Sequence, residues 1–297
     1  MTTIKVDERE LTTIGEQHRI DGLVTAESPI HTGGNAQTGN KQLFRRQSVY
    51  SPERDEFVEV PVIHGNSVRG HLRRLLLRDL LERVDYTLRD ERLYHSLLGG
   101  GILQKDGKAE INAGLRRDVR TYLPPIDLLG MATGNQMFAG TVDVGMLYPV
   151  CEELNFRNET QSEHSFYDFL GDDFATRMAE EPDDAGLSDV EFDLDDEDGE
   201  DSQSMQQIYE YETLSPGTRF EHHFTLKSHA SELAWACLLH GVHLWDQEAT
   251  IGGMAATGHG ELAFEYEADL SGRDAYLNHL DSHEENVIET LDTLSRK

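Results

Sequence analysis

The stretch HGNSVRGHLRRLLLRDLLERV, residues 64–84, is the clearest single element in the sequence and the point from which its fold can be worked out. Its apolar residues recur at spacings of three and four: Val68, Leu72, Leu75, Leu76 and Leu80. This spacing predicts an amphipathic helix over residues 68–84. Asn66 and Ser67 are both residue types that cap helix N-termini, so one of them is expected to begin the helix.

Segments on both sides of this helix have the alternation of apolar and polar residues that is typical of strands. We predict strands over residues 18–28, 57–63, 141–148, 219–227 and 261–266, and further helices over 94–101, 231–245 and 273–294. The order strand, helix, strands, strand, helix, strand indicates an α+β fold with a ferredoxin-like or RRM-like core.

We expect a single domain over residues 1–297, with its core in about 18–148 and 214–268. Residues 31–48 are rich in Gly, Asn and Thr and are predicted to form a long loop. Residues 149–213 are predicted to be an insertion. Within it, residues 179–204 consist almost entirely of acids and small residues, too polar to bury a core, so disorder is expected there.

The charge of the chain is unevenly distributed. Fifty-six acids oppose 26 bases, a net charge of −30 that suits a protein kept soluble in concentrated salt. Residues 1–125 nevertheless hold 19 bases against 18 acids, whereas residues 126–297 hold seven against 38. Positive charge retained in one half of so acidic a chain points to a phosphate-bearing partner.

Two segments of the first half carry this positive charge. The loop at 31–48 contains Lys41, Arg45 and Arg46 and has no acid from residue 31 to 52, and its Gly33 and Gly34 would let a ligand approach the backbone. The predicted helix carries further arginines: Arg69, Arg73 and Arg74 near its N-terminus, where the helix dipole also favours an anion. A solvated charged face is the alternative for the helix.

Other chemistry has weaker support. The glycine-rich segment at 252–260 has the spacing of a phosphate loop, but His259 stands where that motif needs Lys, so Gly252 and Gly253 are better suited to approach of an RNA backbone. Neither His222–His223 nor the His240/His243 pair is accompanied by acids or cysteines at ligand spacing, so no metal or other cofactor is expected. Two distant cysteines, no apolar segment of membrane length and a polar N-terminus favour a cytoplasmic protein.

Four stretches, in order, resemble the RAMP superfamily of CRISPR-associated proteins, specifically its Cas-seven-type backbone subunits. They are LVTAESPIHTGGN at 23–35, PVIHGNSVRGHLR at 61–73, LSPGTRFEHHFTL at 214–226 and IGGMAATGHGEL at 251–262. The resemblance spans most of the chain. It implies an RRM-like palm that grips guide RNA, with a thumb that would lie within 149–213, and type IV or type I-D complexes are the subtypes that we favour.

Carried over by position, the resemblance implies the following guide-RNA contacts: His31, Gly33, Gly34, Asn66, Ser67, Arg69, Arg73, Gly252 and Gly253. It also implies several partners: guide RNA, complementary target nucleic acid, copies of the chain itself and other CRISPR complex subunits. Target-cutting members of the family place an Asp after the first Gly-Gly, and residues 31–52 contain none. A non-catalytic subunit is therefore expected.

Two alternatives remain open at this stage. The first is a guide-processing endoribonuclease of the same superfamily, in which His31 would act as the base. The second is a salt-adapted acidic binding module that does not bind RNA at all.

Overall fold

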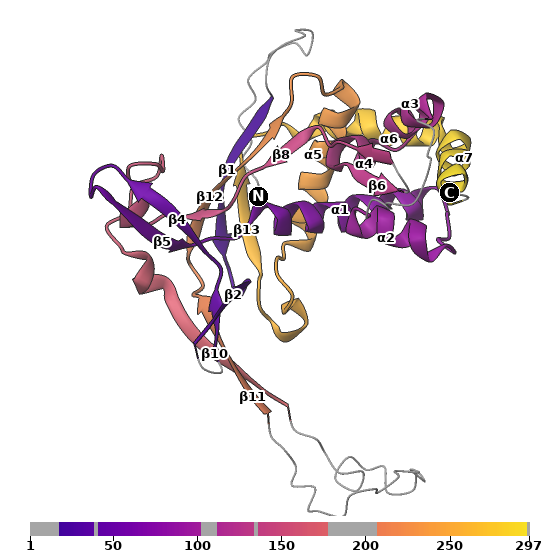
Figure 1. The fold of residues 1–297 in the computed structure, drawn as a ribbon. Coiled ribbons are helices and arrows are strands. Elements are labelled where there is room, and N and C mark those ends of the chain that lie inside the picture. Colours follow the sequence, from indigo (N-terminus) through magenta and orange to yellow (C-terminus); the bar gives the residue numbers. More distant parts are fainter. Residues whose placement is uncertain (1–17, 39–40, 102–111, 134–135, 178–206, 296–297) are drawn as a thin grey trace, which may run out of the picture.

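The computed structural model describes residues 18–38, 41–101, 112–133, 136–177 and 207–295. At its centre is an antiparallel sheet in the order β13-β1-β12-β8, with β9 also paired to β12 (Figure 1). The strands are β1 (Arg19–Ala26), β8 (Val142–Val144), β9 (Tyr148–Pro149), β12 (Arg219–Leu226) and β13 (Leu262–Tyr266). The sheet therefore joins the start, middle and end of the described chain.

Two helices, α1 (Gly65–Arg83) and α5 (Glu232–Glu248), pack against this sheet, and α5 directly follows β12. Trp245 of α5 lies 4.6 Å, between ring centroids, from Phe264 of β13 and 6.1 Å from His71 of α1. Alternate residues of β12, including Phe220 and Phe224, are fully buried beneath them. The alternation read from the sequence thus marks the strand face that the helices cover, and the predicted α+β class is confirmed.

The remaining helices gather at the far end of α1 (Figure 1). They are α2 (Glu91–Gly99), α3 (Ala113–Tyr122), α4 (Pro124–Leu129), α6 (Asp274–Ser282) and α7 (Glu284–Ser295). A small hairpin of β6 (Met131–Thr133) and β7 (Gln136–Phe138) follows α4 in the chain. The helix predicted over 273–294 is in fact two helices, because the backbone leaves helical geometry at His283. Short 3-10 turns complete the set: Glu152–Leu154, Phe166–Phe169, Ala255–Thr257 and Leu270–Arg273.

Two hairpins project from the opposite side of the sheet (Figure 1). One is β4 (Arg46–Ser51) with β5 (Glu56–Pro61), and the other is β10 (Leu170–Arg177) with β11 (Gln207–Leu214), which also pairs with β3 (Lys41–Phe44) and through it with β2 (Gly33–Thr38). The prediction of a loop over residues 31–48 is therefore wrong, because most of these residues form strands. The segment shows no alternation of apolar and polar residues, because its short strands are held by main-chain pairing at the edge of the molecule rather than by a buried face.

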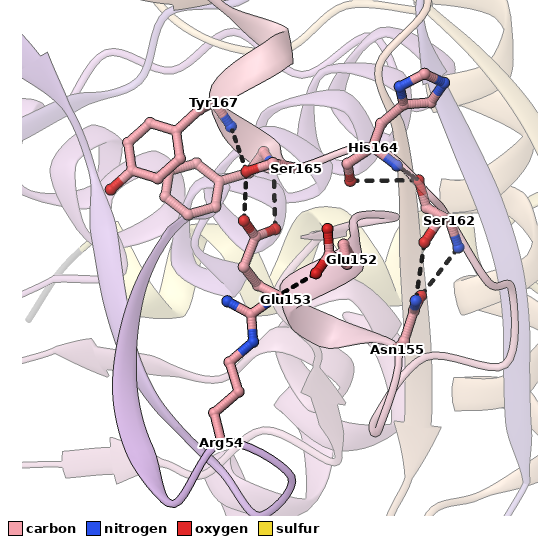
Figure 2. Close-up of polar contacts among 9 residues, drawn as sticks. Arg54, Glu152, Glu153, Asn155, Ser162, His164, Ser165 and Tyr167 are labelled. Atoms are coloured by element: carbon pink, nitrogen blue, oxygen red, sulfur yellow. Dashed lines mark hydrogen bonds and ion pairs between the residues drawn. The ribbon is translucent and has the colours of Figure 1, made fainter.

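A small second core fixes β5 to the segment that follows β9. It consists of Val60, Val62, Cys151, Leu154 and Phe166. Figure 2 shows the polar contacts above it: the carboxylate of Glu153 accepts from the Ser165 hydroxyl and from the Phe166 N–H at 3.0 Å. Burial alone would raise the pKa of Glu153, but these hydrogen bonds outweigh it and the pKa is lowered. Arg54 of the hairpin tip donates to Glu152 at 2.7 Å.

The predicted insertion at 149–213 therefore contains ordered structure at both of its ends. Its acidic stretch at 179–204 lies outside the described residues.

Candidate nucleic-acid interface

The N-terminus of α1 is closed by its own chain. The helix begins at Gly65, three residues earlier than expected, and its cap is His64 rather than Asn66 or Ser67. The His64 Nδ1 accepts from the Asn66 N–H at 3.1 Å, and the His64 carbonyl accepts from the Ser67 N–H at 2.8 Å. Two of the free N–H groups on which an anion site would depend are thus already satisfied, although both side chains are exposed.

The two glycine-bearing segments, residues 31–34 and 252–260, are far apart in sequence but meet in the structure. The Gly260 N–H donates to the Pro29 carbonyl at 2.8 Å, and a Cβ placed on Gly252 would lie 3.0 Å from the His31 carbonyl oxygen. Gly252 has a φ of 95°, a conformation that favours glycine, and Gly253 beside it has no neighbour within 4 Å of its Cβ position. The predicted residues His31, Gly252 and Gly253 therefore share one exposed edge.

Arg45 links this edge to the start of α1. Its N–H donates to the Thr32 carbonyl at 3.0 Å, its carbonyl accepts from Val62, and its Cα is 3.2 Å from the Cβ position of Gly34. Burial, and then the positive charge of Arg45, lower the pKa of His64, the cap residue of α1. Arg45 is exposed and no acid of the described chain pairs with it.

We call this surface the glycine edge. It comprises His31, Gly33, Gly34, Arg45, Gly252 and Gly253, whereas the predicted contacts Asn66 and Ser67 are exposed at the start of α1 and are not included in it.

Lys41 and Arg46, predicted as RNA contacts, are occupied by carboxylates of the β10–β11 hairpin. Lys41 pairs with Asp172. Arg46 pairs with Glu212 at 2.9 Å, and the same Glu212 carboxylate accepts from the Phe44 N–H at 3.0 Å. Glu212 is only 6% exposed, so these contacts join the base of the hairpin to β3 and β4 and leave little positive charge for a ligand.

Arg69 and Arg73 donate to carbonyls at the end of α4, and the RNA contact predicted for the buried Arg73 requires a correction. Arg73 is 7% exposed and donates to the carbonyls of Gly130 at 2.7 Å and Leu129 at 2.9 Å, and Arg69 donates to the same Leu129 oxygen. These carbonyls lie at the C-terminal end of α4, where helix carbonyls have no partner within the helix. Burial, reinforced by the charge of Arg69, lowers the pKa of Arg73 to about 10. We therefore assign Arg73 to capping α4 rather than to RNA.

Arg74, the last predicted contact, is exposed on another face of α1. It borders a groove between α1 and α2 that is lined also by Arg78, Leu81 and Leu98. It is not part of the glycine edge.

The structure adds residues that the sequence did not single out. Tyr211 of β11 lies between two histidines, 5.1 Å from His31 and 5.8 Å from His259 between ring centroids. His31 Nδ1 is 2.7 Å from the Glu212 carbonyl, and His259 Nε2 is 2.9 Å from a carboxylate oxygen of Asp173. The contacts of this cluster join residues from about 50 to 180 positions apart, so only the fold reveals it.

Within the described residues, no three His, Cys, Asp or Glu side chains are grouped in a way that could hold a metal ion. None of the described helices has the length and apolar character needed to cross a membrane. Cys151 and Cys237 are both free and buried.

Comparison with known proteins places the chain in a family. None of the curated proteins matches it. Among solved structures, a chain of a "Type IV-B CRISPR Complex" is similar, with a TM-score of 0.56 and 19% identity over 84% of this chain and 91% of that one. At this identity the likeness concerns the fold. The model of the RAMP superfamily matches residues 23–263, which covers the central sheet and the glycine edge, and the chain therefore belongs to the RAMP superfamily.

Proposed function

We propose that this chain is a guide-RNA-binding backbone subunit of a cytoplasmic CRISPR RNA-guided complex, of type IV or type I-D, and that it does not cut RNA. The family and the fold of the type IV-B chain support this role. In this proposal the central sheet, whose elements run strand, helix, strand, strand, helix, strand, is the RRM-like palm, and the β10–β11 hairpin is the thumb.

One observation carries the proposal: two glycine-bearing segments, about 220 residues apart, come together beside an arginine that has no acid partner in the described chain. Bare backbone and one free guanidinium suit a sugar–phosphate chain, which must approach main-chain N–H groups closely. Contacts of this kind carry no base information, so the guide sequence would be read by pairing with a target.

Several copies would then lie side by side along one guide, with other CRISPR subunits and the complementary strand. Such head-to-tail contacts between copies produce an open helical assembly.

A second candidate, an endoribonuclease, is favoured by one contact. The Glu212 carbonyl can only accept, so His31 must donate through Nδ1, which leaves Nε2 without a proton in the neutral ring and suited to act as a base.

One experiment separates the two functions. Purified protein is incubated in high salt with labelled RNAs of repeat and unrelated sequence, and binding is measured on filters while RNA integrity is followed on denaturing gels. We expect similar affinity for all sequences and intact RNA. Absence of binding would exclude an RNA-binding subunit, and cleavage that His31→Ala abolishes would establish the nuclease.

The matched control is Arg117→Ala. Arg117 has a side chain 80% exposed on α3, far from the glycine edge, so its removal should not change affinity, whereas Arg45→Ala should lower it. Electron microscopy with long guides tests for regularly spaced copies.

A further inference from the structure

His259 connects the glycine-rich segment to the β10–β11 hairpin. Its ring is nearly buried, packs on Tyr211 of β11, and places Nε2 2.9 Å from the Asp173 carboxylate on β10. Asp173 and Tyr211 are directly opposite each other in the hairpin, so His259 contacts both strands at one level. One side chain from the palm thus holds the hairpin at a point beyond its base.

The hydrogen-bond partners of the His259 ring are all acceptors. The Asp173 carboxylate is an acceptor. On the other side of the ring, Nδ1 lies 3.3 Å from the Thr257 carbonyl and 3.4 Å from the Thr257 hydroxyl, which itself donates to the Met254 carbonyl. Every partner therefore accepts, and both ring nitrogens are satisfied only when each carries a proton.

Other contacts also hold the hairpin near this level: Lys41 pairs with Asp172, and Glu212 accepts from Arg46 and from the Phe44 N–H. At its base, Leu214 exchanges main-chain hydrogen bonds with Ile30, and β11 pairs with β3 only at Glu210 and Tyr211. From there the two strands run outward as a two-stranded ribbon (Figure 1). A two-stranded ribbon has little stability of its own, so a contact above its base has a large effect on its direction.

We infer that His259 and Asp173 are positioning residues that hold the hairpin against the glycine-rich segment and thereby set the spacing of the two sides between which RNA backbone lies. The inference rests on the proposed RNA-binding function and adds to it the residue pair that fixes the distance between the hairpin and the glycine-rich segment. Neither residue needs to touch RNA.

The charged and titratable groups near His259 are few. Asp173 comes from β10 and Tyr211 from β11, His31 also contacts the Tyr211 ring, and the residues of its own segment that His259 contacts are uncharged. The backbone N–H of Phe174 and then the hydrogen bond from His259 lower the pKa of Asp173, so its carboxylate stays ionised well into the acid range.

The first test needs no RNA. Spin labels at Glu210→Cys on the hairpin and Ala256→Cys in the glycine-rich segment report the distance between the two sides, and the native cysteines are buried and should not react. We expect one narrow distance distribution in the parent protein and a broader one after Asp173→Asn or His259→Gln. An unchanged distribution in both variants would overturn the inference.

The second test uses RNA. The same two variants should bind guide RNA about three- to tenfold more weakly, a range that allows for the partial exposure of Asp173. His259→Lys keeps a cation that stays charged to about pH 10. It should restore binding at neutral pH, because it can still donate to the Asp173 carboxylate.

The matched control is the exposed pair His95 and Glu91 on α2, 3.6 Å apart. His95→Gln and Glu91→Gln make the same chemical changes and should alter neither readout. If the parent protein binds no RNA but the distances change as expected, the RNA-binding function fails while the positioning role stands. If the parent binds RNA and the variants match it in both tests, the positioning role fails alone.

Discussion

Replacing Arg73 by Met is expected to destabilise the fold rather than weaken RNA binding directly. Met keeps an unbranched apolar side chain but removes every donor. The two donors lost are those that reach the carbonyls of Gly130 and Leu129 at 2.7 and 2.9 Å. Both carbonyls end α4 and stay buried after the substitution, so water cannot readily replace the guanidinium.

The magnitude follows from these two contacts. A hydrogen bond to a charged group contributes about 1.5–3 kcal/mol, and a buried acceptor left without a partner costs a comparable amount. Two effects reduce the sum: burying the guanidinium is itself costly, and Arg69 still reaches the Leu129 carbonyl. We therefore expect a loss of about 2–3 kcal/mol in the free energy of unfolding, equivalent to roughly 3–5 °C in Tm for a chain of this size.

Thermal and urea unfolding of Arg73→Met and Arg74→Met provide the assay. Arg74 is the exposed neighbour on the same helix, and its replacement should change stability by less than about 0.5 kcal/mol. RNA affinity of Arg73→Met, measured well below its Tm, should match the parent. The reasoning is refuted if Arg73→Met unfolds like the parent and binds RNA far more weakly, because Arg73 would then be an RNA contact.

Three further predictions concern charge, protons and the acidic stretch. Arg45→Ala should reduce the slope of log affinity against log salt by about one while Tm is unchanged. Burial lowers the pKa of His71 to about 4 and of His222 to about 3, so in mild acid the unfolded chain binds protons that the native state does not bind. The free energy of unfolding should therefore fall by up to about 1.4 kcal/mol per pH unit per histidine from pH 6.5 toward pH 4. Urea unfolding of His222→Gln should show a shallower fall over the same range. Deletion of residues 180–202 should leave a cooperative melting transition, as calorimetry can show.

Local patterns were sufficient for most of the central fold. The apolar spacing of 68–84 found α1, and alternation found β1, β12 and β13, because these elements each bury one face in the main core. The same approach failed at 31–48, where β2 pairs with β3, β4 pairs with β5 and β3 pairs also with the distant β11. It also misplaced the cap of α1, since His64 is not a residue type commonly expected there.

For the candidate site, residue type indicated which side chains could contact RNA but not which were available. Three arginines show this. The structure exposes Arg45, pairs Arg46 with Glu212 and buries Arg73 against α4. A guanidinium binds a phosphate, a carboxylate or a carbonyl with similar geometry, so its partner depends on what the fold places within reach.

The sequence by itself determined the fold class, the unequal distribution of charge and the glycines that a close backbone approach requires, because each of these depends on residue type and short-range spacing. Only the tertiary structure decided that residues 31–34 and 252–253 form one edge, that Arg73 caps a helix and that His259 meets Asp173. Those contacts join residues from about 55 to 220 positions apart, and such pairings are determined by how the sheet and its hairpins pack, which no local pattern encodes.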